Sequence, residues 1–177
     1  EMRMIAAIER LAHGACGRGV VFGSGMARAD VHAAPHTVPP TGATTPGASQ
    51  EPSAAKLAAV GSVDRHAAQL AELSDRIWAY AGIALREHKS AAALADFAEK
   101  QGFKVQRGVA GMPTAFVATY GEGRPVIGVM GEFDALPGLS QKAVAEKTPL
   151  VEGAGGHGCG HNLFGAGSLG AAIAIEE

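Results

Sequence analysis

A ten-residue run at residues 125–134, PVIGVMGEFD, limits the choice of fold more than any other stretch of this chain. It is apolar almost throughout, as expected for a strand covered on both faces, and it ends in Glu132 and Asp134. Carboxylates at the end of an apolar strand are costly to bury unless they are paired or bound to metal. A surface turn is the alternative, since Pro137 and Gly138 follow directly. The run therefore predicts a layered fold and two acids at one edge of its sheet.

The residues before this run show the periodicity of helices. Residues 62–81 carry apolar side chains at three- and four-residue steps, which is typical of one face of an amphipathic helix. The positions that define this face are Leu70, Leu73, Ile77 and Tyr80. A second helix is predicted over residues 90–102, with Ser90 as its N-cap and Gly102 at its end.

Strand patterns and one further helix complete the predicted order. Residues 103–109 and 113–120 alternate in the manner of strands, and residues 160–177 have the small-residue character of a tightly packed helix. The order is helix, helix, three strands, long loop, helix. This order predicts an α/β layered domain rather than a helix bundle or a sandwich.

The first third of the chain has a different composition. Residues 33–54 are rich in Pro, Thr, Ala and Gly, which predicts a flexible linker. Residues 1–30 can be read as a weak export signal, although charged residues interrupt the apolar run that such a signal needs. We therefore divide the chain into a flexible segment at 1–61 and an ordered domain at 62–177.

Composition excludes several classes of function. The 177 residues carry 15 Lys+Arg against 17 Asp+Glu, without a basic stripe that would favour nucleic acid. The chain has no run of 18 apolar residues, so no transmembrane helix is predicted. Cys16 and Cys159 are too few and too far apart for a disulfide framework. A reduced Cys159 favours a cytoplasmic location, with export through residues 1–30 as the alternative.

The second chemical feature is the stretch HGCGH, which places His157, Cys159 and His161 within five residues. In extended backbone, residues two apart point the same way, so these side chains could converge on one cation. Thiolate and imidazole together favour zinc or another borderline divalent metal. Three alternatives remain: an inert cysteine beside exposed histidines, a purely structural metal, and Cys159 as a nucleophile with a histidine as its base.

The two acids and the Cys/His stretch together indicate a metal site more specifically than either feature does alone. A long loop joins the end of the apolar strand to the motif, and loops of this length are functional or disordered. Open α/β sheets place their ligands at the carboxyl ends of their strands. We therefore expect Glu132 and Asp134 to lie beside the Cys/His stretch, in a metal site with supporting partners.

Three stretches resemble one known family. They are IWAYAGIALREHKSA at 77–91, PVIGVMGEFDALPGLSQ at 125–141 and GAGGHGCGHNLFGAGSLGAAIAI at 153–175. Together they resemble the metal-dependent amidohydrolases that include aminoacylases and related zinc carboxypeptidases, in the branch of the p-aminobenzoyl-glutamate hydrolase B-subunits. The resemblance covers residues 62–177. It implies the N-terminal part of a zinc-peptidase-like catalytic domain, with helices on a central mixed sheet and without the lid domain used for dimerisation.

The resemblance also implies roles for single residues. Cys159 and His161 would be metal ligands, and Asp134 would orient a metal-bound imidazole. Glu132 stands where the wider clan has a ligand histidine and this branch an acidic residue. His157 matches the motif but is not usually a ligand. The catalytic glutamate, which acts as general base, would lie outside this chain.

The implied activity is hydrolysis of an amide bond between an acyl or aminobenzoyl group and an amino acid. Each full-length site would use two divalent metals, zinc or manganese. The expected partners are a small-molecule amide substrate and a second copy or paralogous subunit, with no nucleic acid or membrane. We expect the chain to be a fragment that carries half the site and is inactive alone. The alternatives are a non-catalytic metal-binding or regulatory domain of the same fold, and a thiol hydrolase that uses Cys159.

Overall fold

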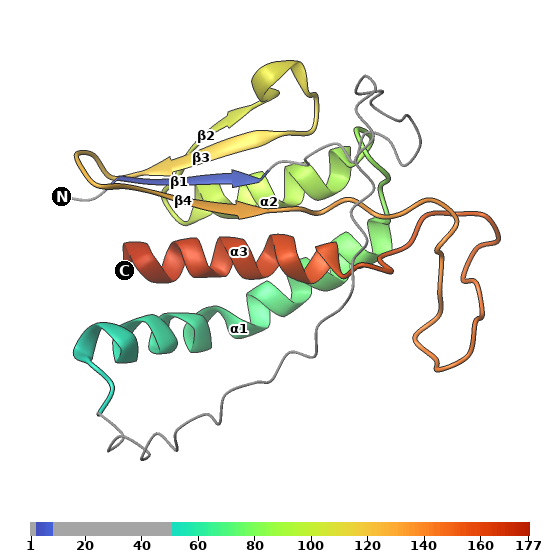
Figure 1. Ribbon diagram of the computed structural model, residues 1–177, viewed down its shortest axis with the longest axis horizontal. Coiled ribbons are helices and arrows are strands. Elements are labelled where there is room, and N and C mark those ends of the chain that lie inside the picture. The colour runs from blue at the N-terminus through green and yellow to red at the C-terminus, as the bar shows by residue number, and fades with distance from the viewer. Residues whose placement is uncertain (1–2, 9–50) are drawn as a thin grey trace, which may run out of the picture. The chain divides into compact units, whose positions relative to one another are not determined.

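The computed structural model describes residues 3–8 and 51–177 (Figure 1). The chain divides into two compact units, residues 1–12 with 54–177 and residues 13–53. Apart from its last three residues, the second unit lies outside the described residues. The predicted linker and most of the export-signal interpretation fall there, so both stay predictions.

Three helices follow in the order expected from the sequence. They are α1 (Ala54–Tyr80), α2 (His88–Lys100) and α3 (His161–Glu176). Helix α1 begins eight residues before the predicted start of order at residue 62, and its first two turns are largely exposed. None of the described helices is long and apolar enough to cross a bilayer.

The capping of α2 corrects one prediction. Its N-cap is Glu87 rather than Ser90, and Ser90 lies inside the helix with no exposed surface. The C-terminal end agrees with the sequence, since Gly102 has φ +88° and its N–H donates to the Glu99 carbonyl at 3.0 Å. A left-handed residue at this place is a common helix stop, and glycine adopts it without strain.

Within residues 3–8 and 51–177, the sheet is mixed and contains four strands. They are β1 (Arg3–Ile8), β2 (Lys104–Arg107), β3 (Phe116–Tyr120) and β4 (Val126–Gly131), with a 3-10 turn, η1 (Val109–Gly111), between β2 and β3. The spatial order is β2-β3-β1-β4. Strand β1 pairs antiparallel with β3 and parallel with β4, and β2 pairs antiparallel with β3.

One strand was not expected from the sequence, and one expectation about the strands is wrong. Residues 3–8 belong to the segment predicted to be flexible, yet they form the strand between β3 and β4. Strand β4, predicted to be central and covered on both faces, is an edge strand of the described sheet. Its Val126 and Met130 side chains are 47% and 52% exposed. Periodicity shows that a strand can be buried, but the neighbours that bury it are set by the tertiary fold.

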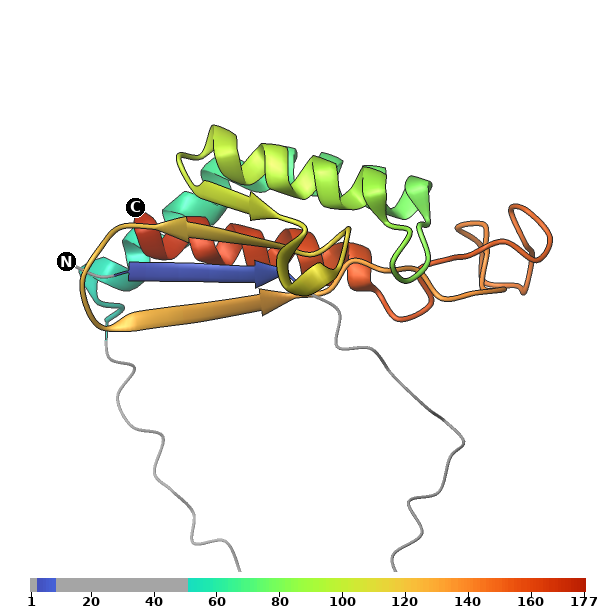
Figure 2. The same cartoon turned by 90° about the horizontal axis from the view of Figure 1, so that it is seen from above.

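The helices cover one face of the sheet (Figure 2). Helix α3 packs on β4 and β1, α2 packs on β2 and β3, and α1 packs against both helices. None of the described helices covers the opposite face, which is turned to the viewer in Figure 1. The largest fully buried side chains of the core between these layers are Ile77, Leu94, Phe116, Leu169 and Ile173. The predicted α/β class is confirmed, whereas the narrower zinc-peptidase-like domain stays a prediction.

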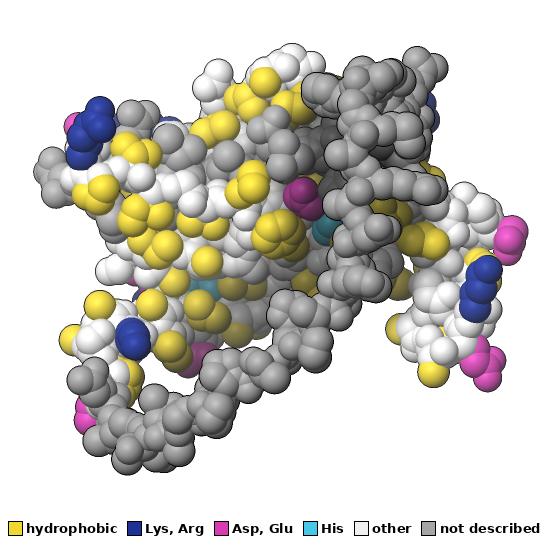
Figure 3. Space-filling view, in the orientation of Figure 1, with side chains coloured by type: hydrophobic (Ala, Val, Ile, Leu, Met, Phe, Trp, Pro, Cys, Tyr) yellow, Lys and Arg dark blue, Asp and Glu magenta, His cyan; other side chains and the backbone are white. Residues whose placement is uncertain are grey.

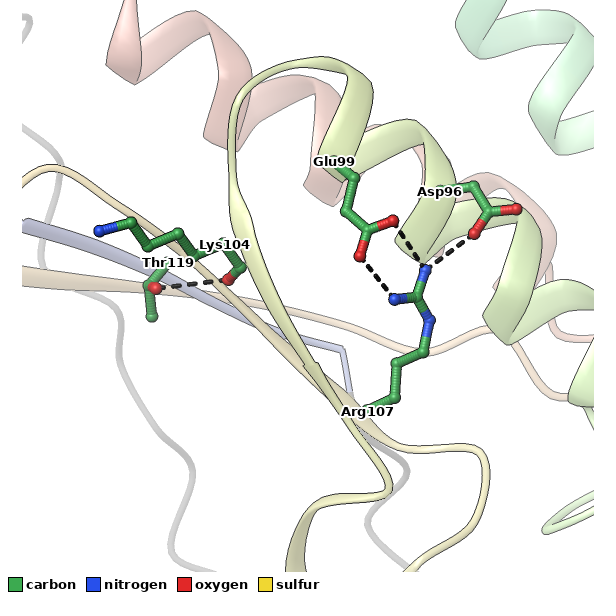
Figure 4. A network of polar contacts seen from close by, with 5 residues as sticks. All are labelled: Asp96, Glu99, Lys104, Arg107 and Thr119. Carbon is green, nitrogen blue, oxygen red and sulfur yellow. Dashed lines mark hydrogen bonds and ion pairs between the residues drawn. The ribbon is translucent and has the colours of Figure 1, made fainter.

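A surface ion-pair network ties α2 to β2 (Figure 4). The Arg107 guanidinium donates to Glu99 Oε1 at 2.6 Å and to Asp96 Oδ1 at 2.8 Å. Hydrogen bonding from Arg107 lowers the pKa of the Glu99 carboxyl. Each of these side chains is about half exposed, so the pairs contribute modestly to stability.

The long loop between β4 and α3 is ordered by its own backbone. Leu136 and Gly156 exchange both backbone hydrogen bonds, at 2.9 and 3.0 Å, and Ser140 N–H donates to the Ala154 carbonyl at 3.0 Å. The Gln141 side chain closes the outer turn, because its amide donates to two backbone carbonyls and its oxygen accepts the Thr148 N–H. The loop therefore extends from the sheet edge as a hydrogen-bonded stem (Figures 1 and 2).

Candidate metal centre

Two acids and one histidine meet where β4 ends and α3 begins. Glu132 and Asp134 follow β4 directly, and His161 is the first residue of α3. The contact depends on close packing, since a Cβ added at Gly165, one turn into α3, would lie 3.0 Å from the Glu132 carbonyl oxygen. Glycine at this position lets the helix approach the end of the strand and brings His161 to the two carboxylates.

The His161 imidazole lies between the two carboxylates. Its Nδ1 is 2.8 Å from Asp134 Oδ1, and its Nε2 is 3.0 Å from Glu132 Oε2. Ligand atoms of all three residues lie within 4.8 Å of one another. The Asp134 side chain is 2% exposed, while those of His161 and Glu132 are 14% and 16% exposed. Asp134 thus supports the site from within, and the other two side chains face its open side.

This geometry constrains the hydrogen-bond roles of the two His161 nitrogens. Asp134 is a carboxylate and accepts the Nδ1–H, so the neutral imidazole has its lone pair on Nε2. That lone pair faces the Glu132 oxygen at 3.0 Å, where two acceptors repel each other unless a cation or a proton lies between them. The arrangement is therefore satisfied either by a bound cation or by an imidazolium that donates to both acids.

The donor set fits a divalent metal. Bonds of about 2.0–2.2 Å from zinc to imidazole nitrogen and carboxylate oxygen are compatible with adjacent ligand atoms about 3 Å apart. Imidazole and carboxylate together suit zinc and manganese better than a soft metal. A carboxylate behind the imidazole, as Asp134 lies here, is the usual partner of a metal-bound histidine. Glu132 and His161 would hold the metal, and Asp134 would fix the ring.

His157 lies apart from this group. Its Nε2–H donates to the Ile77 carbonyl at 3.1 Å, which ties the motif to the end of α1. Its Nδ1 is buried, with no hydrogen-bond partner. Burial lowers the pKa of the His157 imidazole, so the neutral form is favoured. The contact to Ile77 makes His157 an anchor of the motif.

Cys159 is exposed and does not join the Glu132–Asp134–His161 group. The HGCGH stretch is not extended in the structure. Gly158 and Cys159 form a turn, which the Gly160 N–H closes on the His157 carbonyl at 3.3 Å. Alternate side chains therefore do not share one face, because a turn changes the direction of the backbone between them. The ligand role of Cys159 stays a prediction.

One buried acid near the site was missed by sequence reasoning. Glu87 is 3% exposed and accepts a hydrogen bond from Thr114 Oγ1 at 2.8 Å. A small cavity beside it is also lined by Asp134. Glu87 precedes α2, where a negative charge is stabilised by the helix dipole. The amphipathic pattern gave no signal for it, because Glu87 lies outside the helical period.

Fold and site together define an α/β protein that carries a carboxylate–histidine centre suited to a divalent cation. The chain is 46% identical over 107 residues to the B-subunit of p-aminobenzoyl-glutamate hydrolase from Escherichia coli strain K12. The match covers 60% of this chain and 22% of that protein, so the aligned part spans about a fifth of the relative's length. No family model matches the chain. The resemblance inferred from the three stretches is confirmed by this relative.

Proposed function

We propose that this chain carries part of the active site of a metal-dependent amidohydrolase. The observation that supports the proposal best is the His161 imidazole, held by Asp134 at 2.8 Å and turned toward Glu132 at 3.0 Å. Two charged acids beside a histidine at a sheet edge are expensive to maintain for packing alone. They are well explained by a bound cation.

Each residue of the centre has a distinct task in this proposal. Asp134 accepts the Nδ1–H of His161 and so keeps the Nε2 lone pair directed at the cation. Glu132 supplies a carboxylate oxygen from the opposite side, and Cys159 adds a thiolate from the turn before α3. A divalent metal bound there would polarise the scissile carbonyl and lower the pKa of a bound water. The general base would come from residues other than these.

The substrate class follows from the relative. Its name describes hydrolysis of p-aminobenzoyl-glutamate and marks the relative as one subunit of that hydrolase. We extend this to the present chain as hydrolysis of an amide between an aminobenzoyl or acyl group and an amino acid. A second copy or a related subunit is the corresponding partner.

The thiol-hydrolase alternative has weaker support. In the part of the chain that the structure describes, no hydrogen bond joins Cys159 to either neighbouring imidazole. Both nitrogens of His161 face carboxylates, and the His157 Nε2–H is engaged with Ile77. Neither ring is placed to take the proton of the thiol.

Cobalt binding tests the metal centre directly. Co²⁺ commonly substitutes for zinc and gives a near-ultraviolet charge-transfer band when a thiolate is a ligand. We expect the 177-residue chain to bind Co²⁺ and to show this band, which Cys159→Ser removes and Cys16→Ser leaves. Glu132→Gln should weaken binding more than tenfold. A chain that binds no Co²⁺, or a Glu132→Gln variant that binds as well as the parent, contradicts the proposed centre. Binding without the band contradicts the role of Cys159 alone.

An activity measurement tests the proposal that this chain carries only part of the active site. The chain alone, with Zn²⁺ or Mn²⁺, should release no p-aminobenzoate from p-aminobenzoyl-glutamate at an enzyme-like rate, because none of the three residues of the centre is free to act as general base in this proposal. Turnover at such a rate would contradict the half-site proposal. Turnover that survives chelators but is abolished by iodoacetamide would favour the thiol hydrolase.

A further inference from the structure

A cavity of about 420 Å³ lies between the end of α1 and the long loop. One wall includes Trp78. The long loop contributes Leu139, Leu150 and Val151 to the lining, together with Gly155 and Gly156. We call this space the loop cavity. Its volume falls within the range of small-molecule sites.

The walls of the loop cavity are built by hydrogen bonds. Ser140 N–H pairs with the Ala154 carbonyl, and Ser140 Oγ accepts the Val151 N–H at 3.0 Å. The opposite side is tied down by the His157 contact to the Ile77 carbonyl, one residue before Trp78. The cavity is therefore a feature of the ordered stem.

The lining is apolar and aromatic, with a positive bias. Trp78 is 37% exposed, and Leu139, Leu150 and Val151 are 46%, 56% and 59% exposed, so large apolar side chains stand open to solvent here. Figure 3 shows hydrophobic side chains on the protruding loop beside its few charged ones. The lining residues, all of them described, include Lys142 and no carboxylate. A flat apolar group that belongs to an anion suits this chemistry.

The loop cavity and the metal centre are joined by the motif itself. His157 and Gly158 line the cavity, and His161 lies three residues further on, at the start of α3. The Gly158–Gly160 turn therefore connects the lining of the cavity to the first residue of α3.

We propose that the loop cavity binds the aromatic acyl group of the substrate and places its amide carbonyl toward Glu132 and His161. The inference rests on the proposed amidohydrolase function, which it sharpens to N-aroyl amino acids. The ring packs against the Trp78 indole and covers the exposed leucines and valine of the loop. Aromatic stacking and burial of apolar surface supply the attraction. Lys142 favours an anionic substrate over a cationic one.

Trp78 is the single tryptophan of the chain, so one indole N–H signal in a ¹⁵N–¹H NMR spectrum reports on the cavity. We expect p-aminobenzoyl-glutamate to shift this signal in a saturable way without added metal. N-acetyl-glutamate, which has the same amino acid but no ring, should bind at least about tenfold more weakly. An indole signal that does not move, or equal binding of both compounds, overturns the inference.

Single substitutions test whether p-aminobenzoyl-glutamate binds in the loop cavity. Ala154 lines the loop cavity, so Ala154→Leu should weaken binding of p-aminobenzoyl-glutamate at least about tenfold. Ala145→Leu makes the same change at an exposed position outside the lining and should have no effect. If Ala154→Leu fails to fold, Leu150→Asp replaces it, because Leu150 is 56% exposed and its aspartate would repel the anionic ligand. Unchanged binding in the folded variant overturns the inference.

The test of the loop cavity can fail or succeed independently of the test of the metal centre. Binding in the loop cavity is measured without metal, and the metal centre is measured with Co²⁺ and no substrate. Ring binding without Co²⁺ binding supports the cavity and contradicts the amidohydrolase centre. Co²⁺ binding without ring-dependent shifts leaves the centre intact and overturns the assignment of the cavity.

Discussion

Asp134 and His161 are 27 residues apart in the chain and in direct contact in the fold, with Asp134 Oδ1 2.8 Å from His161 Nδ1. The contact joins the end of a strand to the start of a helix. It also determines which nitrogen of the ring remains free, because Asp134 accepts the proton on Nδ1. The second nitrogen then faces Glu132, so one hydrogen bond orients the whole centre.

This contact predicts that Asp134→Asn weakens metal binding. The asparagine amide can present an N–H to Nδ1, which would favour the wrong tautomer of His161. Loss of such a supporting partner typically lowers metal affinity about 10–100-fold. Calorimetric titration of the chain with Zn²⁺ measures the change. Glu122→Gln removes the same charge from an exposed position in the turn between β3 and β4 and is the matched control. Equal affinities for the two variants would show that Asp134 does not support the centre.

The close approach of α3 to β4 predicts opposite effects for two neighbouring glycines. A Cβ at Gly165 would lie 3.0 Å from the Glu132 carbonyl oxygen, whereas a Cβ at Gly167 meets nothing within 4 Å. Gly165→Ala should lower the free energy of unfolding by about 1–3 kcal/mol through overpacking. Gly167→Ala should raise it by about 0.5–1 kcal/mol, because alanine is the better helix former. Urea denaturation compares them, and a stabilising Gly165→Ala would contradict the packing.

The corrected capping of α2 predicts the effect of Ser90→Ala. Ser90 Oγ is buried and has no hydrogen-bond partner, so its removal should leave the free energy of unfolding unchanged or raise it by up to about 1 kcal/mol. An N-cap serine would instead lose about 0.5–2 kcal/mol on this substitution.

A second buried serine is the control for Ser90. Ser74 Oγ accepts a hydrogen bond from Asn162 Nδ2 at 3.0 Å. Ser74→Ala should lower the free energy of unfolding by about 1–3 kcal/mol, because it leaves the buried Asn162 amide unsatisfied. Thermal denaturation measures both variants. A loss of stability in Ser90→Ala as large as that in Ser74→Ala would restore the capping role.

The network between α2 and β2 predicts a pH dependence. Because the hydrogen bond from Arg107 lowers the pKa of Glu99 below 4.5, the folded chain binds fewer protons than the unfolded chain just below that pH. The stabilisation is therefore present above about pH 4.5 and is lost as the pH falls through the folded pKa. Carbon-detected NMR titration of the Glu99 carboxyl measures the shift. Arg107→Gln should raise the pKa toward 4.5, and Lys104→Gln, a charge change on the same strand, should leave it in place.

Local patterns predicted most elements of the described domain. The spacing of Leu73 and Ile77 identified the buried face of α1, and Gly102 identified the end of α2. The N-terminal strand was not predicted, because a short apolar-rich run of six residues carries little signal of a distant partner. Strand pairing depends on residues more than a hundred positions away, as between Ile5 and Thr119.

The candidate site, like the fold, was predictable from the sequence only in part. The sequence by itself determined which side chains are candidates for chemistry, since Glu132, Asp134, His157, Cys159 and His161 were all selected from their types and spacing. Only the tertiary structure decided which of them meet. Close packing of α3 on β4 brings His161 between the two acids, while the Gly158–Cys159 turn leaves the thiol exposed and directs His157 to α1. Sequence spacing predicts the direction in which a side chain points only where the backbone is regular. In glycine-rich turns, contacts with the rest of the fold determine that direction.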